Sequence, residues 1–182
     1  IHSHTNVYTN SLVPPTSPAQ SDMAYIAGQA RGAGAVPGRG ATVQGLPILK
    51  PPYDRITAYN MNTGDIVWQK PHSSTPDDIK NHPLMKGLDL PRLGQPGRTF
   101  IGVLTTKNLV IAGEGGVHSN PAGRRVALLR AYDKLTGADV GAVEMPNKQT
   151  GSPMSYSIDG KQFIVLAVSG NDGAEILAFA LP

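Results

Sequence analysis

The feature that most constrains the fold is an internal repeat. The segments 56–68 and 129–139 both contain Ala-Tyr-(Asn/Asp)-x-x-Thr-Gly at the same internal spacing. In each copy a strand-like run ends at Asn60 or Asp133, whose side chain can accept hydrogen bonds from the following turn, and Thr-Gly supplies that turn. Repeated strand–turn–strand units are typical of repeated sheets. The main all-β architecture built this way is the β-propeller.

The rest of the chain follows the same all-β pattern, with short apolar and β-branched runs between turn residues. With 21 glycines and 16 prolines, yet 40% hydrophobic residues, the composition is that of a globular chain with many turns. The dipeptide Asp159-Gly160 predicts a hairpin turn, and 77–80 is predicted as a short helix. Strands are predicted over 23–27, 55–59, 65–69, 101–105, 109–113, 127–133, 141–144, 154–158, 162–168 and 175–180.

Two irregular stretches interrupt this pattern. Residues 11–50, rich in Pro, Gly, Ser and Ala, are interpreted either as a long ordered insertion or as a disordered linker. Residues 71–96 contain many prolines. The first six residues hold neither an initiator Met nor a signal peptide, as expected for a piece cut from a longer chain.

Composition excludes several functional classes. The formal net charge is +3, and the basic residues are scattered, so no nucleic-acid-binding stripe is visible. The longest apolar runs, such as 163–168, are far too short to span a bilayer. The chain has no cysteine, which excludes disulfides and thiolate metal sites.

The repeat carries a resemblance to a known family. Ala58 to Trp68 fits Ala-x-(Asp/Asn)-x-x-Thr-Gly-x-x-x-Trp, and the chain thereby resembles the eight-bladed quinoprotein dehydrogenases, in which this motif docks neighbouring blades. Trp68 is accordingly expected to contact the next blade, whereas the second copy has Gly141 at that place and lacks the contact. Further similarity, including features of the quinoprotein glucose dehydrogenase branch, lies in 45–53, 81–88, 151–165 and 177–182.

The resemblance implies the C-terminal portion of an eight-bladed propeller with long irregular loops. The chain would then divide into the end of one blade with a long insertion (1–70), a loop (71–97), the penultimate blade (98–146) and an incomplete last blade (147–182). Closed propellers typically have four to eight blades, so these parts cannot close a ring. The remaining blades are therefore an expected partner, whether in another chain or in other parts of the same protein.

The resemblance also implies a function. It predicts a periplasmic enzyme, membrane-associated through parts outside this chain, that oxidises a sugar or alcohol with pyrroloquinoline quinone (PQQ) and Ca²⁺ and passes electrons to a quinone or a cytochrome c. Two rivals stand beside it: a non-enzymatic propeller scaffold that binds partner proteins, and a free-standing small β protein that acts as a binding module.

The same resemblance puts the catalytic aspartate and the Ca²⁺ ligands upstream of residue 1, so no catalytic or metal-binding residue is assigned in this chain. Predicted cofactor contacts lie where the chain enters the last two blades near the propeller axis: Arg98, Thr99, Gly151, Ser152 and Pro153. Small residues there would let backbone amides approach a planar, carboxylate-bearing cofactor, and Arg98 could pair with a carboxylate. The alternative is that these are only tight turns, and the Trp-Asn-Gly-Gly of related alcohol dehydrogenases is absent.

Other chemically suggestive residues have plainer interpretations. Asp133 and Asp159 are interpreted as turn residues rather than catalytic carboxylates. His2 and His4 alternate on one predicted strand and form either a metal-binding pair or a surface pair. His118 lies in a glycine-rich loop that could reach a substrate or partner. The glycine-rich stretch 31–40 does not join a strand to a helix, which excludes a dinucleotide site.

Overall fold

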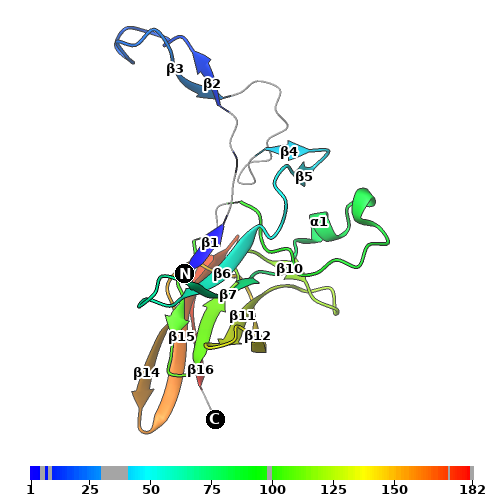
Figure 1. Cartoon of the computed structure of the whole chain (residues 1–182), viewed down its shortest axis with the longest axis vertical. Helices are drawn as coiled ribbons and strands as arrows, with labels where there is room; N and C mark the ends of the chain where they lie inside the picture. Colours follow the sequence, from blue (N-terminus) through cyan, green and yellow to red (C-terminus); the bar gives the residue numbers. More distant parts are fainter. Residues whose placement is uncertain (5–6, 8–9, 30–40, 98–99, 172, 181–182) are drawn as a thin grey trace.

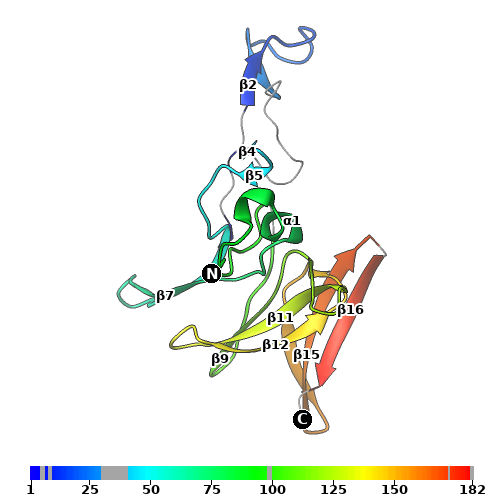
Figure 2. The same ribbon diagram turned by 90° about the vertical axis from the view of Figure 1, so that its right-hand side faces the viewer.

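The structure is a computed structural model that describes residues 1–4, 7, 10–29, 41–97, 100–171 and 173–180. Within these residues the body consists of three antiparallel sheets that stack beside one another (Figures 1 and 2). Two hairpins of the predicted insertion, β2 (Asn10–Val13) with β3 (Ile26–Gln29) and β4 (Thr42–Val43) with β5 (Leu46–Pro47), project away from the sheets.

Each sheet is a short meander. The first has the order β1 (His2–His4), β6 (Asp54–Tyr59), β7 (Ile66–Pro71). The second has the order β8 (Leu104–Thr105), β9 (Leu109–Gly113), β11 (Arg125–Asp133), β12 (Asp139–Met145), and β10 (His118–Ser119) extends the β9 side of β11. The third has the order β14 (Met154–Ile158), β15 (Lys161–Gly170), β16 (Gly173–Ala180), and β13 (Lys148–Gln149) pairs with the end of β15.

The middle sheet is buried on both faces because side chains alternate along its strands. On one face, Ile111, Ala127 and Leu129 form a core with residues of β15. On the other face, Val110, Ala112 and Tyr132 form a second core with Ile56 and Trp68 of the first sheet. Such face-to-face stacking of successive antiparallel meanders is the arrangement of propeller blades.

Trp68 docks the first sheet onto the second, as the repeat predicts. Its indole Nε1 donates to the Lys134 carbonyl at 2.9 Å. The ring lies against the β11–β12 turn, where Gly137 has φ +69° and an added Cβ would stand 2.6 Å from the indole. At Gly141, the equivalent place in the second copy, an added Cβ meets no atom within 4 Å, so the predicted lack of a docking contact is confirmed.

The turn residues also behave as predicted. The Asn60 side chain accepts from Asn62 N–H, and the Asp133 side chain accepts from the N–H groups of Leu135 and Thr136. Asp159 and Gly160 both have positive φ, 48° and 76°, as a two-residue type I′ hairpin turn requires. Both aspartates therefore lie in turns, as predicted.

Several element boundaries differ from the predictions. Most strand ends shift by one or two residues, while the helix α1 (Asp77–Lys80) is confirmed and is followed by a 3₁₀ turn, η1 (Pro83–Met85). The strand predicted over 101–105 is wrong before residue 104, because the Gly102 carbonyl is bound by a side chain instead of a neighbouring strand. The strand predicted over 23–27 instead spans 26–29, where pairing with β2 sets the register from Val13 opposite Ile26.

The longest stretches of structure are strands. In the part of the chain that the structure describes, neither helix comes near the length and apolarity needed to cross a bilayer.

Candidate cofactor cavity

A cavity of about 590 Å³ lies where the inner edges of the three sheets converge. Three segments line it: 2–4 on β1, 100–102 just before β8, and 150–152 between β13 and β14. Since β1, β8 and β14 are each the first strand in the order of their sheet, the cavity faces the side that would be the axis of a propeller.

Backbone dominates two of the cavity walls. Gly102 packs against Ser152 so closely that a Cβ at position 102 would collide with the Ser152 side chain and Cα. The carbonyls of Gly102 and Gly151 are both bound by the side chain of Gln149. These walls therefore present peptide groups with little side-chain bulk, as the cofactor prediction supposed.

Two rings come together where the β1 wall meets the 100–102 wall. His4 and Phe100 meet edge to face, with their ring centroids 5.6 Å apart. The Phe100 side chain is exposed despite its size. Phe100 thus offers the cavity a flat apolar surface of the kind that packs against a planar ring system.

On the β1 wall of the cavity, His2 lies near a buried carboxylate. His2 Nε2 is 3.7 Å from Asp54 Oδ2 and makes no hydrogen bond. Asp54 is fully buried and accepts from the N–H and the hydroxyl of Ser73. Burial by itself raises the pKa of Asp54, but His2 and the Ser73 hydrogen bonds outweigh it, so that pKa lies below its usual value. Asp54 is therefore an anion held by its neighbours.

The sequence-predicted cofactor contacts divide into three cases. Gly151 and Ser152 line the cavity. Pro153 is buried and does not line it. Arg98 and Thr99 lie outside the described residues. His2 and His4, predicted to share one face of a strand, both line the cavity from β1. Within the described residues, no group of three or more His, Cys, Asp or Glu is placed to hold a metal ion.

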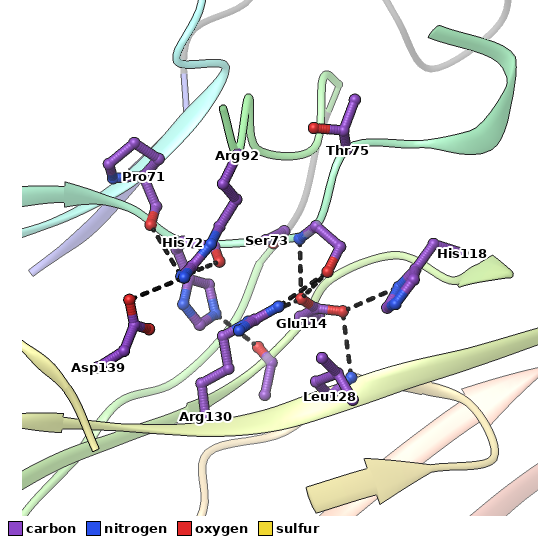
Figure 3. A network of polar contacts seen from close by, with 12 residues as sticks. Pro71, His72, Ser73, Thr75, Arg92, Glu114, His118, Leu128, Arg130 and Asp139 are labelled. Carbon is purple, nitrogen blue, oxygen red and sulfur yellow. Dashed lines mark hydrogen bonds and ion pairs between the residues drawn. The ribbon is translucent and has the colours of Figure 1, made fainter. Parts of the chain in front are cut away.

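A buried polar network, which sequence reasoning missed, lies between the first two sheets (Figure 3). At its centre is Glu114, 1% exposed, which accepts from the Ser74 N–H and hydroxyl, the Leu128 N–H and Arg130 Nε. His118 Nδ1 lies 3.3 Å from Glu114 Oε2. Burial raises the pKa of Glu114, but His118, Arg130 and Ser74 together hold it below its usual value.

A second branch of this network contains His72, which is fully buried. His72 Nε2 lies 3.0 Å from the Gly113 carbonyl, and because a carbonyl only accepts, Nε2 carries the proton. His72 Nδ1 then accepts from the Tyr132 hydroxyl at 2.8 Å, and that hydroxyl accepts from Arg92, which also pairs with Asp139. Burial lowers the pKa of His72, which keeps the ring neutral in this chain of bonds.

Two larger hollows, about 700 and 820 Å³, lie among the connecting loops. The first includes His118, and several of its charged groups have partners: Asp77 accepts from Ser119 and Arg125, and Glu144 pairs with Arg124. The inner cavity differs because the backbone of Gly102 and Gly151 and the exposed ring of Phe100 contribute to its walls. It is therefore the better candidate for a ligand site.

Comparison with known proteins places these observations in a family. A family model described as PQQ, glucose/ethanol/alcohol dehydrogenase, beta-propeller domain, matches residues 9–164. A probable quinate dehydrogenase (quinone) of Xanthomonas campestris pv. juglandis is 30% identical over 83% of this chain and 20% of its own length. The quinoprotein glucose dehydrogenase of Escherichia coli K12 is 29% identical over 76% of this chain and 17% of its own.

A more distant relative is the glycerol dehydrogenase large subunit of Gluconobacter thailandicus, 27% identical over 76% of this chain and 18% of its own. The chain thus spans about a fifth of the length of the curated relatives that it matches.

Proposed function

Because this chain belongs to the family of PQQ glucose/ethanol/alcohol dehydrogenase β-propeller domains, we propose that it is part of an enzyme that oxidises a sugar or alcohol with PQQ. Membership confirms the predicted fold class, an all-β propeller portion. It also favours the dehydrogenase over the scaffold and the free-standing binding module, since the relatives are named as dehydrogenases.

The observation that carries the proposal is the inner cavity, whose walls fit a planar, carboxylate-bearing group. Phe100 supplies an apolar face, Gly102 and Gly151 supply backbone without bulk, and Ser152 supplies a hydroxyl donor. When bound, PQQ supplies the two-electron oxidant for the substrate hydroxyl. The part of this chain would be to bind and orient the cofactor: Phe100 would offer its ring system an apolar surface, and Ser152 would offer a hydroxyl donor.

One face of the third sheet is left uncovered by the described residues. The outer face of the third sheet carries exposed Met154, Tyr156, Ile158 and Ile176. Exposed apolar area on this scale is typical of a surface that another element covers. We propose that further blades cover it, with the divisions 1–70, 71–97, 98–146 and 147–182 as the limits of the blade parts. The catalytic base and Ca²⁺ ligands belong to those further blades in this proposal.

The location and the electron acceptor follow from the same family. We propose a periplasmic enzyme that passes electrons to a quinone or a cytochrome c. A quinone acceptor is supported by the relatives whose names carry the word quinone.

A binding experiment tests the proposal. In the full-length enzyme that carries this segment, PQQ is titrated into the apoprotein and binding is followed by quenching of protein fluorescence, with dye reduction by sugars and alcohols as a second measurement. Ser152→Leu should push against Gly102, narrow the cavity and raise the Kd for PQQ about tenfold or more, which is about 1.4 kcal/mol. Ser157→Leu, at an exposed position on β14 that does not line the cavity, is the matched control.

The outcomes are distinct. A wild-type protein that binds no PQQ contradicts the proposed function and favours the alternative hypothesis, a non-enzymatic propeller scaffold. A wild type that binds PQQ while Ser152→Leu binds it equally well places the cofactor elsewhere.

A further inference from the structure

Gln149 joins the two backbone walls of the inner cavity. It lies in β13 and is 2% exposed. Its side-chain Nε2 donates to the Gly102 carbonyl at 2.8 Å and to the Gly151 carbonyl at 2.6 Å, while its Oε1 accepts from the Gly113 N–H at 2.5 Å. Carbonyls only accept and an N–H only donates, so these three bonds fix which end of the amide is which.

The two carbonyls belong to different walls. Gly102 lies on the segment that enters the second sheet, and Gly151 on the segment that enters the third. Both N–H groups of one amide bind these two segments next to the point where Gly102 packs against Ser152, so the side chain of Gln149 ties the two walls together. Its oxygen is anchored in turn at the end of β9, through Gly113.

The lack of a side chain at Gly113 lets its backbone approach Gln149 closely. A Cβ added there would stand 2.6 Å from Gln149 Oε1 and 2.9 Å from Gln149 Cβ. The close approach of the backbone therefore depends on the lack of a side chain at position 113. A buried amide with all of its partners in place is a rigid element, and rigid elements lower the cost of ordering a binding site.

We propose that Gln149 is a positioning residue for cofactor binding: it touches no cofactor but holds the two cavity walls at the separation that a planar, carboxylate-bearing cofactor needs. This inference rests on the proposed function. Without the amide, only the packing of Gly102 against Ser152 would hold the two walls together, and PQQ would have to order them further as it binds.

The first test replaces the amide with an apolar side chain of similar length. In the full-length apoenzyme, Gln149→Met should raise the Kd for PQQ about tenfold, measured by fluorescence titration. Gln162→Met is the matched control, because Gln162 is an exposed glutamine on β15 whose side chain bonds only Ser155 among the bonds the structure describes.

The second test separates hydrogen bonding from mere filling of space. In Gln149→Glu the shape is kept and the carboxylate can still accept from Gly113, but an ionised carboxylate has no proton to donate to Gly102 or Gly151. The Kd for PQQ, divided by the wild-type Kd at the same pH, should be about tenfold at pH 8 and fall towards one at pH 5, as the buried carboxyl gains a proton that it can donate.

Each result decides something. If the wild type does not bind PQQ, the proposed function fails before the role of Gln149 is reached. If the wild type binds and both variants match it, Gln149 does not position the walls. A Gln149→Glu ratio that stays constant from pH 8 to pH 5 also overturns the inference, and this ratio decides alone should Gln149→Met fail to fold.

Discussion

Replacing Arg130 with methionine should destabilise the seam between the first two sheets by about 3 kcal/mol. In the wild type, Arg130 Nε donates to Glu114 Oε1 at 2.9 Å, and the two side chains are 13% and 1% exposed. Removing one partner of a buried ion pair costs about 3–5 kcal/mol, because the other charge stays buried without compensation. The lower end applies here, since Ser74 and Leu128 still donate to Glu114.

Hydrogen exchange of the full-length enzyme measures this cost locally. The amides of Ser74 and Leu128 both bond to Glu114, so they report on opening of the seam. A loss of about 3 kcal/mol corresponds to roughly a hundredfold faster exchange of these amides in Arg130→Met. The matched control is Arg124→Met, which breaks the Arg124–Glu144 pair, 70% and 42% exposed, and should change exchange little.

A double variant identifies the cause. If the uncompensated charge of Glu114 is responsible, Glu114→Gln combined with Arg130→Met should restore most of the protection at Ser74, because a neutral amide oxygen can still accept from the Ser74 N–H. The Leu128 N–H bonds the other carboxylate oxygen, which the amide replaces with a donor, so protection there should return less. Exchange as fast in the double variant as in Arg130→Met refutes the electrostatic explanation. Wild-type exchange rates in Arg130→Met refute the importance of the pair altogether.

Two further predictions concern the same seam. Trp68→Ala should lower the thermal unfolding midpoint, because it removes about 3–5 kcal/mol of unfolding free energy. Trp68→Phe keeps much of the packing but loses the hydrogen bond to Lys134, so its unfolding free energy should fall by about 1 kcal/mol more than the change in packing alone explains. Equal midpoints for the wild type and Trp68→Ala would contradict the docking role of Trp68. Burial holds the pKa of His72 below its ordinary value of 6.5, so its contribution to stability is complete above that pH and decreases as the pH falls below it. His72→Gln should flatten this decrease in unfolding experiments between pH 7 and pH 5, and an unchanged pH profile would show that His72 is not its source.

The blade pattern could be predicted from the sequence because its determinants are local. Alternation along 109–113 and the turn residues Asn60 and Asp133 act within a few positions of the strands that they shape. Trp68 could be predicted to dock because the repeat fixes its place on a blade. Such patterns can be recognised in the sequence without knowing which elements pack against them.

The polar residues that matter for the seam and the cavity gave no such signal. His72 stands in the irregular stretch 71–96, where nothing in the sequence indicates burial, yet it is fully buried, because its partners Gly113 and Tyr132 come from the next sheet. Glu114 and Gln149 likewise acquire their roles through bonds to residues distant in sequence. One weak signal existed: a charged residue directly after the apolar strand 109–113, followed by two glycines.

Gly113 connects the seam to the cavity and explains why these polar groups are buried together. Its carbonyl lies 3.0 Å from His72 Nε2 on the seam side, and its N–H donates to Gln149 on the cavity side. Gln149 then binds both cavity walls through Gly102 and Gly151. A chain of hydrogen bonds thus runs from the buried, neutral His72 through the backbone of Gly113 to Gln149 and the two cavity walls. In a cavity built from loops alone, no such buried bonds would fix the position of the walls, because loop backbone without buried partners is the most mobile part of a fold. The polar seam thus gives the inner ends of the second and third sheets a fixed relation that apolar packing, being non-directional, does not specify.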